Sequence, residues 1–323
     1  MVVPTRDRWP LVDRAVRSAL QQEAVRVRVV VVDDGSATPA PAAGALADPR
    51  VTVLRRERSA GVGAARNAGI ALAAEPWTAL LDDDDLWAPH KLATQVAACT
   101  ATGRRWSYAA ALRVGADLRP INVVPAPAAE QLAEMMLHAN VVPAGASNVL
   151  VATELLRAVG GFDEAFSHLA DWELWLRLIE AGPVAAVDEP LVAYVQHPEG
   201  MVSTHPASIM REFATLQSRH RDFARRLGGR FTPDELLAWT GHRHLAAGRP
   251  RRFAATWLAA TVRHRRPALL RRGVEVLRER RRWRSPTPAD APPWLPCGEA
   301  QDPGQGDGEA ARRVHADVDA PDQ

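Results

Sequence analysis

Two apolar runs in the N-terminal half of the chain each end in a group of carboxylates, and this feature constrains the fold most. Residues 27–32 (VRVVVV) lead into Asp33-Asp34-Gly35-Ser36, and residues 77–81 (WTALL) lead into Asp82-Asp83-Asp84-Asp85. Runs rich in β-branched and apolar residues are typical of strands buried on both faces of a parallel sheet. Because ligands of α/β proteins bind at the carboxyl ends of such strands, we expect the two acidic groups to lie together at that edge.

Helical and strand-like segments alternate around these runs. The βαβα order predicts parallel strands joined by right-handed crossovers. The fold class we expect is therefore α/β, a Rossmann-like and mostly parallel sheet flanked by helices, with a C-terminal helical extension. The segments expected as strands are 1–5, 27–32, 51–54, 77–81, 148–151 and short strands within 107–125. The expected helices are 9–22, 64–74, 89–101, 130–137 and 171–180, and residues 210–284 are expected to be wholly helical.

Charge is divided unevenly along the chain. Residues 1–205 hold 18 Lys and Arg against 24 Asp and Glu, residues 206–284 hold 20 against 6, and residues 285–323 hold 2 against 8. The three net charges are therefore −6, +14 and −6. We expect a domain at 1–205 that carries the chemistry, a basic helical extension at 206–284, and a disordered acidic tail at 285–323.

Composition excludes several classes of protein. Lys91 is the only lysine and does not follow a glycine, so the chain has no P-loop. Only two cysteines are present, Cys99 and Cys297, and their wide separation argues against a disulfide framework or a cysteine zinc site. The sequence has neither a signal peptide nor an apolar run of about 18 residues, so we expect a cytoplasmic protein.

Asp82–Asp85 are the densest chemical signal. Four adjacent carboxylates repel one another unless a cation lies among them, and a hard divalent metal, Mn²⁺ or Mg²⁺, is the simplest one. Strand alternation directs Asp82 and Asp84 to one side and Asp83 to the other, so one carboxylate can serve the metal and another a polar ligand group. The alternative is a solvated acidic loop that caps the following helix.

A glycine-containing segment, residues 61–69 (GVGAARNAG), precedes a predicted helix, as phosphate-binding loops do. Arg66 stands where the dinucleotide-binding pattern has its third glycine, so a nicotinamide enzyme is disfavoured. The alternative for this segment is a tight turn that only leads into the helix.

Taken together, these motifs resemble family 2 of the inverting glycosyltransferases, which have the GT-A fold. The resemblance covers about residues 1–205, and its motifs stand in the family's order. They are residues 3–8 (VPTRDR), 31–36 (VVDDGS), 61–69, 81–87 (LDDDDLW), and 160–164 (GGFDE) followed by 171–177 (DWELWLR). The chain departs from the family at Arg6, where an aromatic residue is common. It also lacks the apolar residues normally found ahead of Val2, which suggests a late start codon or a weakened edge of the pocket.

The resemblance implies a role for each residue that matches a family motif. Asp171 matches the catalytic base, and Asp84 would bind the divalent metal. His197 stands in a segment where family members often carry a histidine near the diphosphate or metal. The alternatives are a carboxylate that stabilises a helix N-terminus for Asp171 and a surface histidine for His197. The residues implied at the donor are Pro4, Thr5 and Asp34 at the base, Arg66 and Asn67 near the ribose or phosphates, and Asp82 and Asp83, with Asp83 at the ribose.

The expected function is transfer of a sugar from a nucleotide-diphosphate donor to a saccharide or lipid-linked acceptor, in cell-envelope or surface polysaccharide synthesis. A metal stabilises charge on the leaving diphosphate, and a base across the ring activates the acceptor hydroxyl, which predicts inversion. The alternatives are a sugar-nucleotide nucleotidyltransferase and a nucleotide-sugar binding protein without catalysis. Acceptor specificity is expected within residues 125–170, including His138, Asn140, Ser147 and Asn148.

Residues 211–284 alternate arginines with apolar residues. One interpretation is a helical appendage with a solvated arginine face. The other is attachment to an anionic membrane, which would place the protein peripherally at the inner face of the plasma membrane. Nucleic-acid binding is disfavoured because no nucleic-acid motif accompanies the charge.

Overall fold

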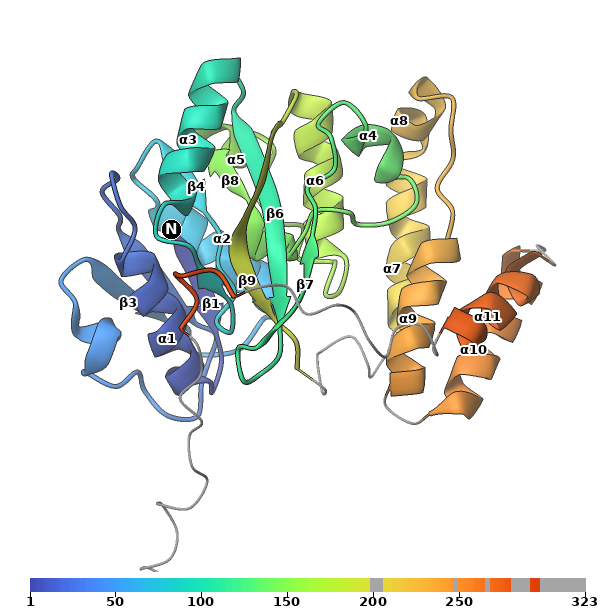
Figure 1. The fold of residues 1–323 in the computed structure, drawn as a ribbon, viewed down its shortest axis with the longest axis horizontal. Coiled ribbons are helices and arrows are strands. Elements are labelled where there is room, and N and C mark those ends of the chain that lie inside the picture. Colours follow the sequence, from blue (N-terminus) through green and yellow to red (C-terminus); the bar gives the residue numbers. More distant parts are fainter. Residues whose placement is uncertain (198–205, 247–248, 265–267, 280–290, 297–323) are drawn as a thin grey trace, which may run out of the picture.

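The computed structural model describes residues 1–197, 206–246, 249–264, 268–279 and 291–296. Its N-terminal part is a parallel sheet in the order β1 (Val2–Thr5), β2 (Val29–Asp33) and β3 (Val51–Arg55). Successive side chains of these strands point to opposite faces. Val3 and Val31 share a core cluster with residues of α1 (Trp9–Leu20), and Val2 and Val32 share one with residues of α2 (Val62–Leu72). Helices therefore cover both faces, as the valine-rich run predicts (Figure 1).

A second sheet has the strand order β4-β8-β6-β9-β5, with β7 beside β6. β6 and β9 are parallel, whereas the other pairs of this sheet are antiparallel. The predicted α/β class is confirmed, and the parallel pairing is confined to the first sheet and β6–β9. The short connection at residues 115–119 explains the β6–β7 pair, because parallel neighbours need a long crossover. The strands are β4 (Trp77–Ala79), β5 (Leu86–Trp87), β6 (Trp106–Val114), β7 (Pro120–Val124), β8 (Leu150–Ala152) and β9 (Ala185–Val195).

The two sheets meet at the segment that precedes the acidic group. Leu80 forms a parallel bridge with Val2, and the Leu81 amide donates to the Val2 carbonyl at 3.1 Å. The chain therefore pairs with β8 up to Ala79 and lies beside β1 from Leu80 onward. Because of this change of partner, β4 ends two residues before the predicted end of the strand. Asp82–Asp85 are thereby delivered next to the carboxyl end of β1. The helices around these sheets are α3 (Lys91–Thr102), α4 (Leu132–Met135), α5 (Thr153–Ala158) and α6 (Ala170–Ala181), with 3₁₀ turns η1 (Gly44–Ala47) and η2 (Gly145–Asn148).

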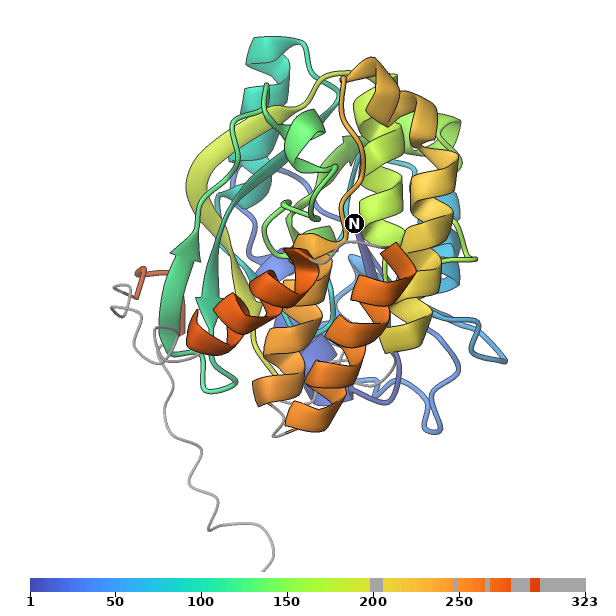
Figure 2. The ribbon, with the colours of Figure 1, turned by 90° about the vertical axis from the view of Figure 1, so that its right-hand side faces the viewer.

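The predicted C-terminal helical extension is present, but its first helix belongs to the main core. Ile209, Phe213 and Leu216 of α7 are buried in the same cluster as Trp172 of α6. Phe223 and Ala224 of the second helix also belong to that cluster. The last three helices form a cluster of their own around Phe253 and Trp257, and they lie side by side at one end of the molecule (Figure 2). The helices of this part are α7 (Pro206–Arg219), α8 (Arg221–Arg226), α9 (Asp234–Ala246), α10 (Pro250–His264) and α11 (Ala268–Glu279). No helix of the described residues is both long and apolar enough to cross a membrane.

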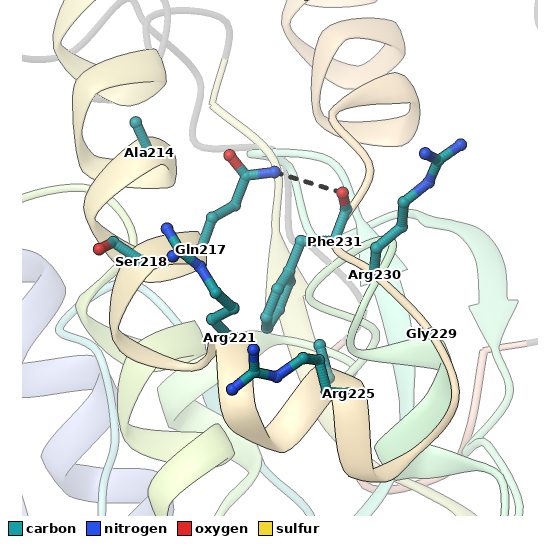
Figure 3. A pocket seen from close by; sticks show the side chains of 9 residues that line it. Ala214, Gln217, Ser218, Arg221, Arg225, Gly229, Arg230 and Phe231 are labelled. Atoms are coloured by element: carbon teal, nitrogen blue, oxygen red, sulfur yellow. Dashed lines mark hydrogen bonds between the residues drawn. The ribbon is translucent and has the colours of Figure 1, made fainter.

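A cavity of about 370 Å³ lies between α7, α8 and the loop after α8. Gln217 of α7 donates its side-chain amide to the Phe231 carbonyl at 3.2 Å and ties the loop to the helix (Figure 3). Arg221, Arg225 and Arg230 line this cavity. None of the residues predicted to form the active site contributes to it.

Part of the segment predicted as a disordered tail is packed. Among residues 285–323, the structure describes 291–296, and the rest of the predicted tail lies outside the described residues. Leu295 is 3% exposed and shares an apolar cluster with Leu86 of β5 and with Ala193 and Val195 of β9. The prediction of disorder was therefore wrong for residues 291–296, because an apolar side chain there finds a pocket on the second sheet.

Gly69 of α2 marks the closest approach of a helix to the first sheet. A Cβ atom at Gly69 would lie 2.4 Å from Val2 Cγ1 and 3.1 Å from Val32 Cγ2. Only glycine allows α2 to lie this close to β1 and β2. Gly63, in the first turn of the same helix, has more room, since its Cβ would have its nearest neighbour at 3.7 Å.

We expect Gly69→Ala to lower the free energy of unfolding by about 1–3 kcal/mol, because overpacking against β1 outweighs the better helix propensity of alanine. Gly63→Ala is the matched control and should leave stability unchanged or slightly raised. Urea unfolding of both variants measures the difference. Equal effects at the two glycines would contradict the close approach.

Candidate active site

Asp82 is paired with an arginine from the helix that follows the glycine-containing segment. Arg66 Nη2 donates to Asp82 Oδ1, and the Arg66 guanidinium lies 4.9 Å from the centre of the Phe162 ring. The Asp82 amide donates to Ser147 Oγ at 3.0 Å. Arg66 itself is buried, whereas the Asp82 side chain is one third exposed. Thus the structure brings together two of the predicted donor-site residues, Arg66 and Asp82.

Asp83 and Asp84 share one guanidinium. Arg8, just before α1, donates from Nη1 to Asp83 Oδ1 at 2.6 Å and from Nη2 to Asp84 Oδ2 at 2.7 Å. The Thr5 hydroxyl donates to Asp83 Oδ2 at 2.7 Å, so the last residue of β1 contacts the acidic group. Burial raises the pKa of Asp83 to about 7, although Arg8 and the Thr5 hydroxyl oppose the shift.

Asp85 has a structural position that the sequence did not indicate. Its side chain is fully buried, accepts from Ser147 Oγ at 2.5 Å, and accepts from the Val195 amide at 2.9 Å. Burial and the nearby Asp84 and Asp82 raise the pKa of Asp85 well above its usual range. Asp85 therefore joins the acidic loop to η2 and to the end of β9.

His197 lies next to Asp84, as predicted for a metal-ligand pair. His197 Nε2 is 3.3 Å from Asp84 Oδ2, and this buried nitrogen has no hydrogen-bond partner. An unpartnered imidazole nitrogen beside a carboxylate oxygen fits a divalent metal of the Mn²⁺ type. Among the described residues, no group of three or more His, Cys, Asp or Glu side chains could hold a metal. Two protein ligands fit a metal whose remaining ligands come from a substrate or water.

Asp171 lies in the first turn of α6. Its Oδ2 accepts from Asn140 Nδ2 at 2.9 Å, and its Oδ1 accepts from the Trp172 amide at 2.7 Å. Burial raises the pKa of Asp171, opposed by the charge of Arg66 and reinforced by that of Asp82. The charges of both residues act on Asp171, so its carboxylate lies within electrostatic range of the Arg66–Asp82 pair.

Two residues predicted to contact the donor, Asp34 and Asn67, have side chains that form hydrogen bonds within the protein. Asp34 accepts from Arg56 Nη1 at 2.9 Å, from the Ser59 hydroxyl at 2.7 Å and from the amides of Ala60 and Gly61. It therefore orders the loop before α2.

Asn67 donates to the Phe162 carbonyl at 2.8 Å and accepts from the Phe162 amide at 2.8 Å, which fixes the turn that supports Arg66. Pro4 forms part of β1. Direct donor contacts by Pro4, Asp34 and Asn67 stay predictions.

Of the four residues expected to set acceptor specificity, two have buried side chains that bond within the protein. Asn148 is buried and bonds to the Ala109 backbone, and Ser147 serves Asp82 and Asp85, so both are internal supports. His138 lies 2.9 Å from the Thr232 hydroxyl. Asn140 alone of the four touches Asp171. Arg8 was missed as a partner of Asp83 and Asp84, although its place in the first motif was a signal.

Comparison with known proteins agrees with this fold. The chain aligns with S. aureus TarS 1–349 in complex with UDP-GlcNAc at a TM-score of 0.54, with 16% identity over 87% of this chain and 90% of that one. It also aligns with the mannosyltransferase PcManGT from Pyrobaculum calidifontis in complex with GDP-Man and Mn²⁺, at a TM-score of 0.50 and 19% identity over 81% of this chain and 74% of that one. The fold is thus that of the GT-A glycosyltransferases.

A family model matches the N-terminal part of the sequence. Residues 1–135 match the model of glycosyl transferase family 2, which confirms the predicted resemblance over that part of the chain. The succinoglycan biosynthesis protein ExoO of Rhizobium meliloti is 35% identical over 206 residues, which are 59% of this chain and 58% of ExoO. The chain therefore spans little more than half the length of this relative.

The raised pKa of Asp83 predicts how stability depends on pH without metal or nucleotide. The folded-state pKa of about 7 exceeds the ordinary value of 3.8, so the folded protein binds more protons between these values. Stability should therefore fall as pH rises through this window, by at most about 1.4 kcal/mol per pH unit. Asp83→Asn should remove this part of the slope.

Urea unfolding between about pH 4 and pH 7 compares the two proteins, because this window spans the two pKa values. Asp117→Asn, which removes an exposed turn carboxylate, is the control and should run parallel to the unsubstituted protein. Parallel curves for Asp83→Asn would contradict the prediction.

Proposed function

We propose that the protein is an inverting, metal-dependent glycosyltransferase. It would move a sugar from a nucleotide-diphosphate donor to a saccharide or lipid-linked acceptor, in cell-envelope or surface polysaccharide synthesis. The observation that carries the proposal is the partly buried carboxylate of Asp171 within electrostatic range of the Arg66–Asp82 pair. Asp83 and Asp84 follow Asp82 in the chain, and His197 faces Asp84.

In this proposal, the strand-end residues bind the donor. Thr5 and Asp83 are hydrogen-bonded at the end of β1 and offer a carboxylate for the ribose hydroxyls. Asp84 and His197 would hold the divalent metal, which when bound acts as a Lewis acid toward the leaving diphosphate. Arg66, held over Phe162, supplies a fixed positive charge near the phosphates. Donors bound to PcManGT and TarS, GDP-Man and UDP-GlcNAc, are of this chemical class.

Asp171 would act as the general base. As the acceptor oxygen forms its bond to the anomeric carbon, the bond from that carbon to the diphosphate breaks, and the acceptor proton passes to a carboxylate oxygen of Asp171. Burial suits this role, because a raised pKa makes the carboxylate a better proton acceptor near neutral pH. The Asn140 amide and the Trp172 amide hold the carboxylate in place. A single displacement of this kind inverts the anomeric configuration.

The two alternatives make different demands on the site. A nucleotidyltransferase needs several basic residues near β1 for a triphosphate. Of the two local arginines, Arg6 is 59% exposed and paired with Asp7, which leaves Arg8 alone to meet that charge. A binding protein without catalysis needs no base at Asp171. The site therefore favours transfer.

We expect Asp171→Asn to lower turnover by about 10²- to 10⁴-fold, because the amide cannot accept the proton. Donor binding should change little, since Asp171 is not placed among the donor residues. Asp84→Ala should instead weaken metal-dependent donor binding. A thermal-shift screen of UDP- and GDP-sugars with and without Mn²⁺ identifies the donor, and nucleoside diphosphate release measures turnover.

Asp222→Asn, an exposed carboxylate of α8, serves as the control for loss of one negative charge. Near-normal turnover in Asp171→Asn would show that the base lies elsewhere. Equal loss of donor affinity in Asp171→Asn and Asp84→Ala would contradict the separate roles.

We propose further that the last helices attach the protein to an anionic membrane. Leu258 and Val262 of α10 and Leu270 and Val274 of α11 are 46–70% exposed, and these four residues are called the α10–α11 face. Exposed arginines, including Arg251 and Arg271, lie on the same two helices. Apolar residues flanked by arginines are typical of segments that bind at the surface of anionic bilayers, where each arginine contributes about 1 kcal/mol.

Replacing Leu258 and Val262 together by glutamate should reduce binding to phosphatidylglycerol vesicles at least about tenfold, because charge replaces apolar contact. Leu72→Glu alters a similarly exposed leucine on α2 and should not change binding. Co-sedimentation with phosphatidylglycerol and with phosphatidylcholine vesicles measures the effect. Unchanged binding of the double variant would exclude the α10–α11 face as the contact.

A further inference from the structure

The backbone of Arg8 is fixed by hydrogen bonds, whereas its side chain is partly exposed to solvent. The Arg8 carbonyl accepts from the amides of Leu11 and Val12 and so begins α1. The preceding Asp7 is tied to the next loop, since its amide donates to Ser36 Oγ at 2.8 Å. The Arg8 side chain is 39% exposed even while it bridges the two carboxylates. The guanidinium can therefore change partners without disturbing the helix.

The same carboxylate oxygen serves Arg8 and faces His197. Asp84 Oδ2 accepts from Arg8 Nη2 at 2.7 Å and lies 3.3 Å from His197 Nε2. A divalent cation held by Asp84 and His197 would lie close to the Arg8 guanidinium. Two positive charges so close together repel each other. A cation bound to Asp84 Oδ2 would therefore be destabilised while Arg8 keeps its present position.

Arg8 also neutralises a carboxylate that no other basic side chain of the described residues pairs with. Arg8 is the only basic side chain among them in an ion pair with Asp83, and it shares Asp84 only with His197. Removal of Arg8 with nothing in its place would leave Asp83 without an ion pair and Asp84 with His197 alone. A diphosphate with its cation brings both a replacement for Arg8 at the carboxylates and a new anionic partner for its guanidinium.

We propose that Arg8 exchanges partners when the donor binds. In the free protein, its guanidinium neutralises Asp83 and Asp84. In the donor complex it moves to the diphosphate, which leaves Asp84 to the metal and Asp83 to the ribose. This inference rests on the proposed function and adds a consequence: metal and nucleotide bind cooperatively, because a cation bound alone expels Arg8 without giving it a new partner.

The test measures Mn²⁺ binding directly, apart from activity. Electron paramagnetic resonance on the full chain gives the Mn²⁺ affinity of the unsubstituted protein and of Arg8→Gln, each with and without UDP or GDP. Arg8→Gln should bind Mn²⁺ alone about tenfold more tightly, since the competing charge is gone. It should bind the nucleoside diphosphate about tenfold more weakly in the presence of Mn²⁺, since the exchanged contact is lost. The coupling between the two ligands should shrink accordingly.

Two further variants separate exchange from a general charge effect. Arg6→Gln removes the same charge from the same loop, but the nearest acidic oxygen to Arg6 is on Asp7 at 3.7 Å, so both affinities should be unchanged. Arg8→Lys keeps the charge without the two-pronged geometry and should give intermediate affinities. Circular dichroism establishes that each variant is folded.

The proposal requires both changes in Arg8→Gln: tighter binding of Mn²⁺ alone and weaker binding of the nucleoside diphosphate. If Arg8→Gln binds Mn²⁺ alone no more tightly than the unsubstituted protein, or if its nucleotide affinity is unaltered, the exchange is wrong even though the protein binds donor. If the unsubstituted protein binds neither Mn²⁺ nor a nucleoside diphosphate, the proposed function fails and the exchange fails with it. The two failures are therefore distinguishable.

Discussion

Repulsion among four consecutive carboxylates is the constraint on which the site depends. Several parts of the chain stabilise these carboxylates: Asp82 pairs with Arg66 of α2, Asp83 and Asp84 share Arg8 before α1, and Asp85 accepts from the Ser147 hydroxyl and the Val195 amide. These partners come from elements far apart in sequence. The acidic loop can therefore adopt this conformation only when both sheets are assembled, and this links the integrity of the fold to the charge balance of the site.

The candidate base depends on the helical extension as well as on the N-terminal part. Glu212 of α7 accepts hydrogen bonds from the amides of Ser167, His168 and Leu169, just before α6 begins. A carboxylate there satisfies amides at the helix start and interacts favourably with the helix dipole. Asp171 follows two residues after Leu169. The helix that presents the base is thus fixed by a residue outside the region that resembles the family.

Sequence patterns predicted those features that follow from local rules. The valine-rich run at β2 and the acidic strand ends predicted buried strands with ligands at their carboxyl ends, and Arg66 and Asp82 do pair there. The contacts of Arg8 and Asp85 were not predicted: Arg8 stands in the first motif, but a polar contact between distant residues leaves no periodic signal that names its partner. Asp34 stands in a clear motif, but its hydrogen bonds were not predicted. All four go to the loop between β3 and α2, and they depend on how that loop folds back.

The boundaries predicted from net charge differ from the boundaries of the apolar cores. The boundaries predicted at 205 and 285 follow net charge, which is a property of exposed side chains. Cores follow buried apolar residues, and these cross both boundaries: Phe213 lies in the main core, and Leu295 lies against Val195. Val195 donates to Asp85 and stands two residues before His197. Contacts from beyond each boundary therefore reach residues next to the proposed active site: Phe213 packs in the same core as α6, which carries Asp171, and Leu295 packs against Val195, whose amide donates to Asp85.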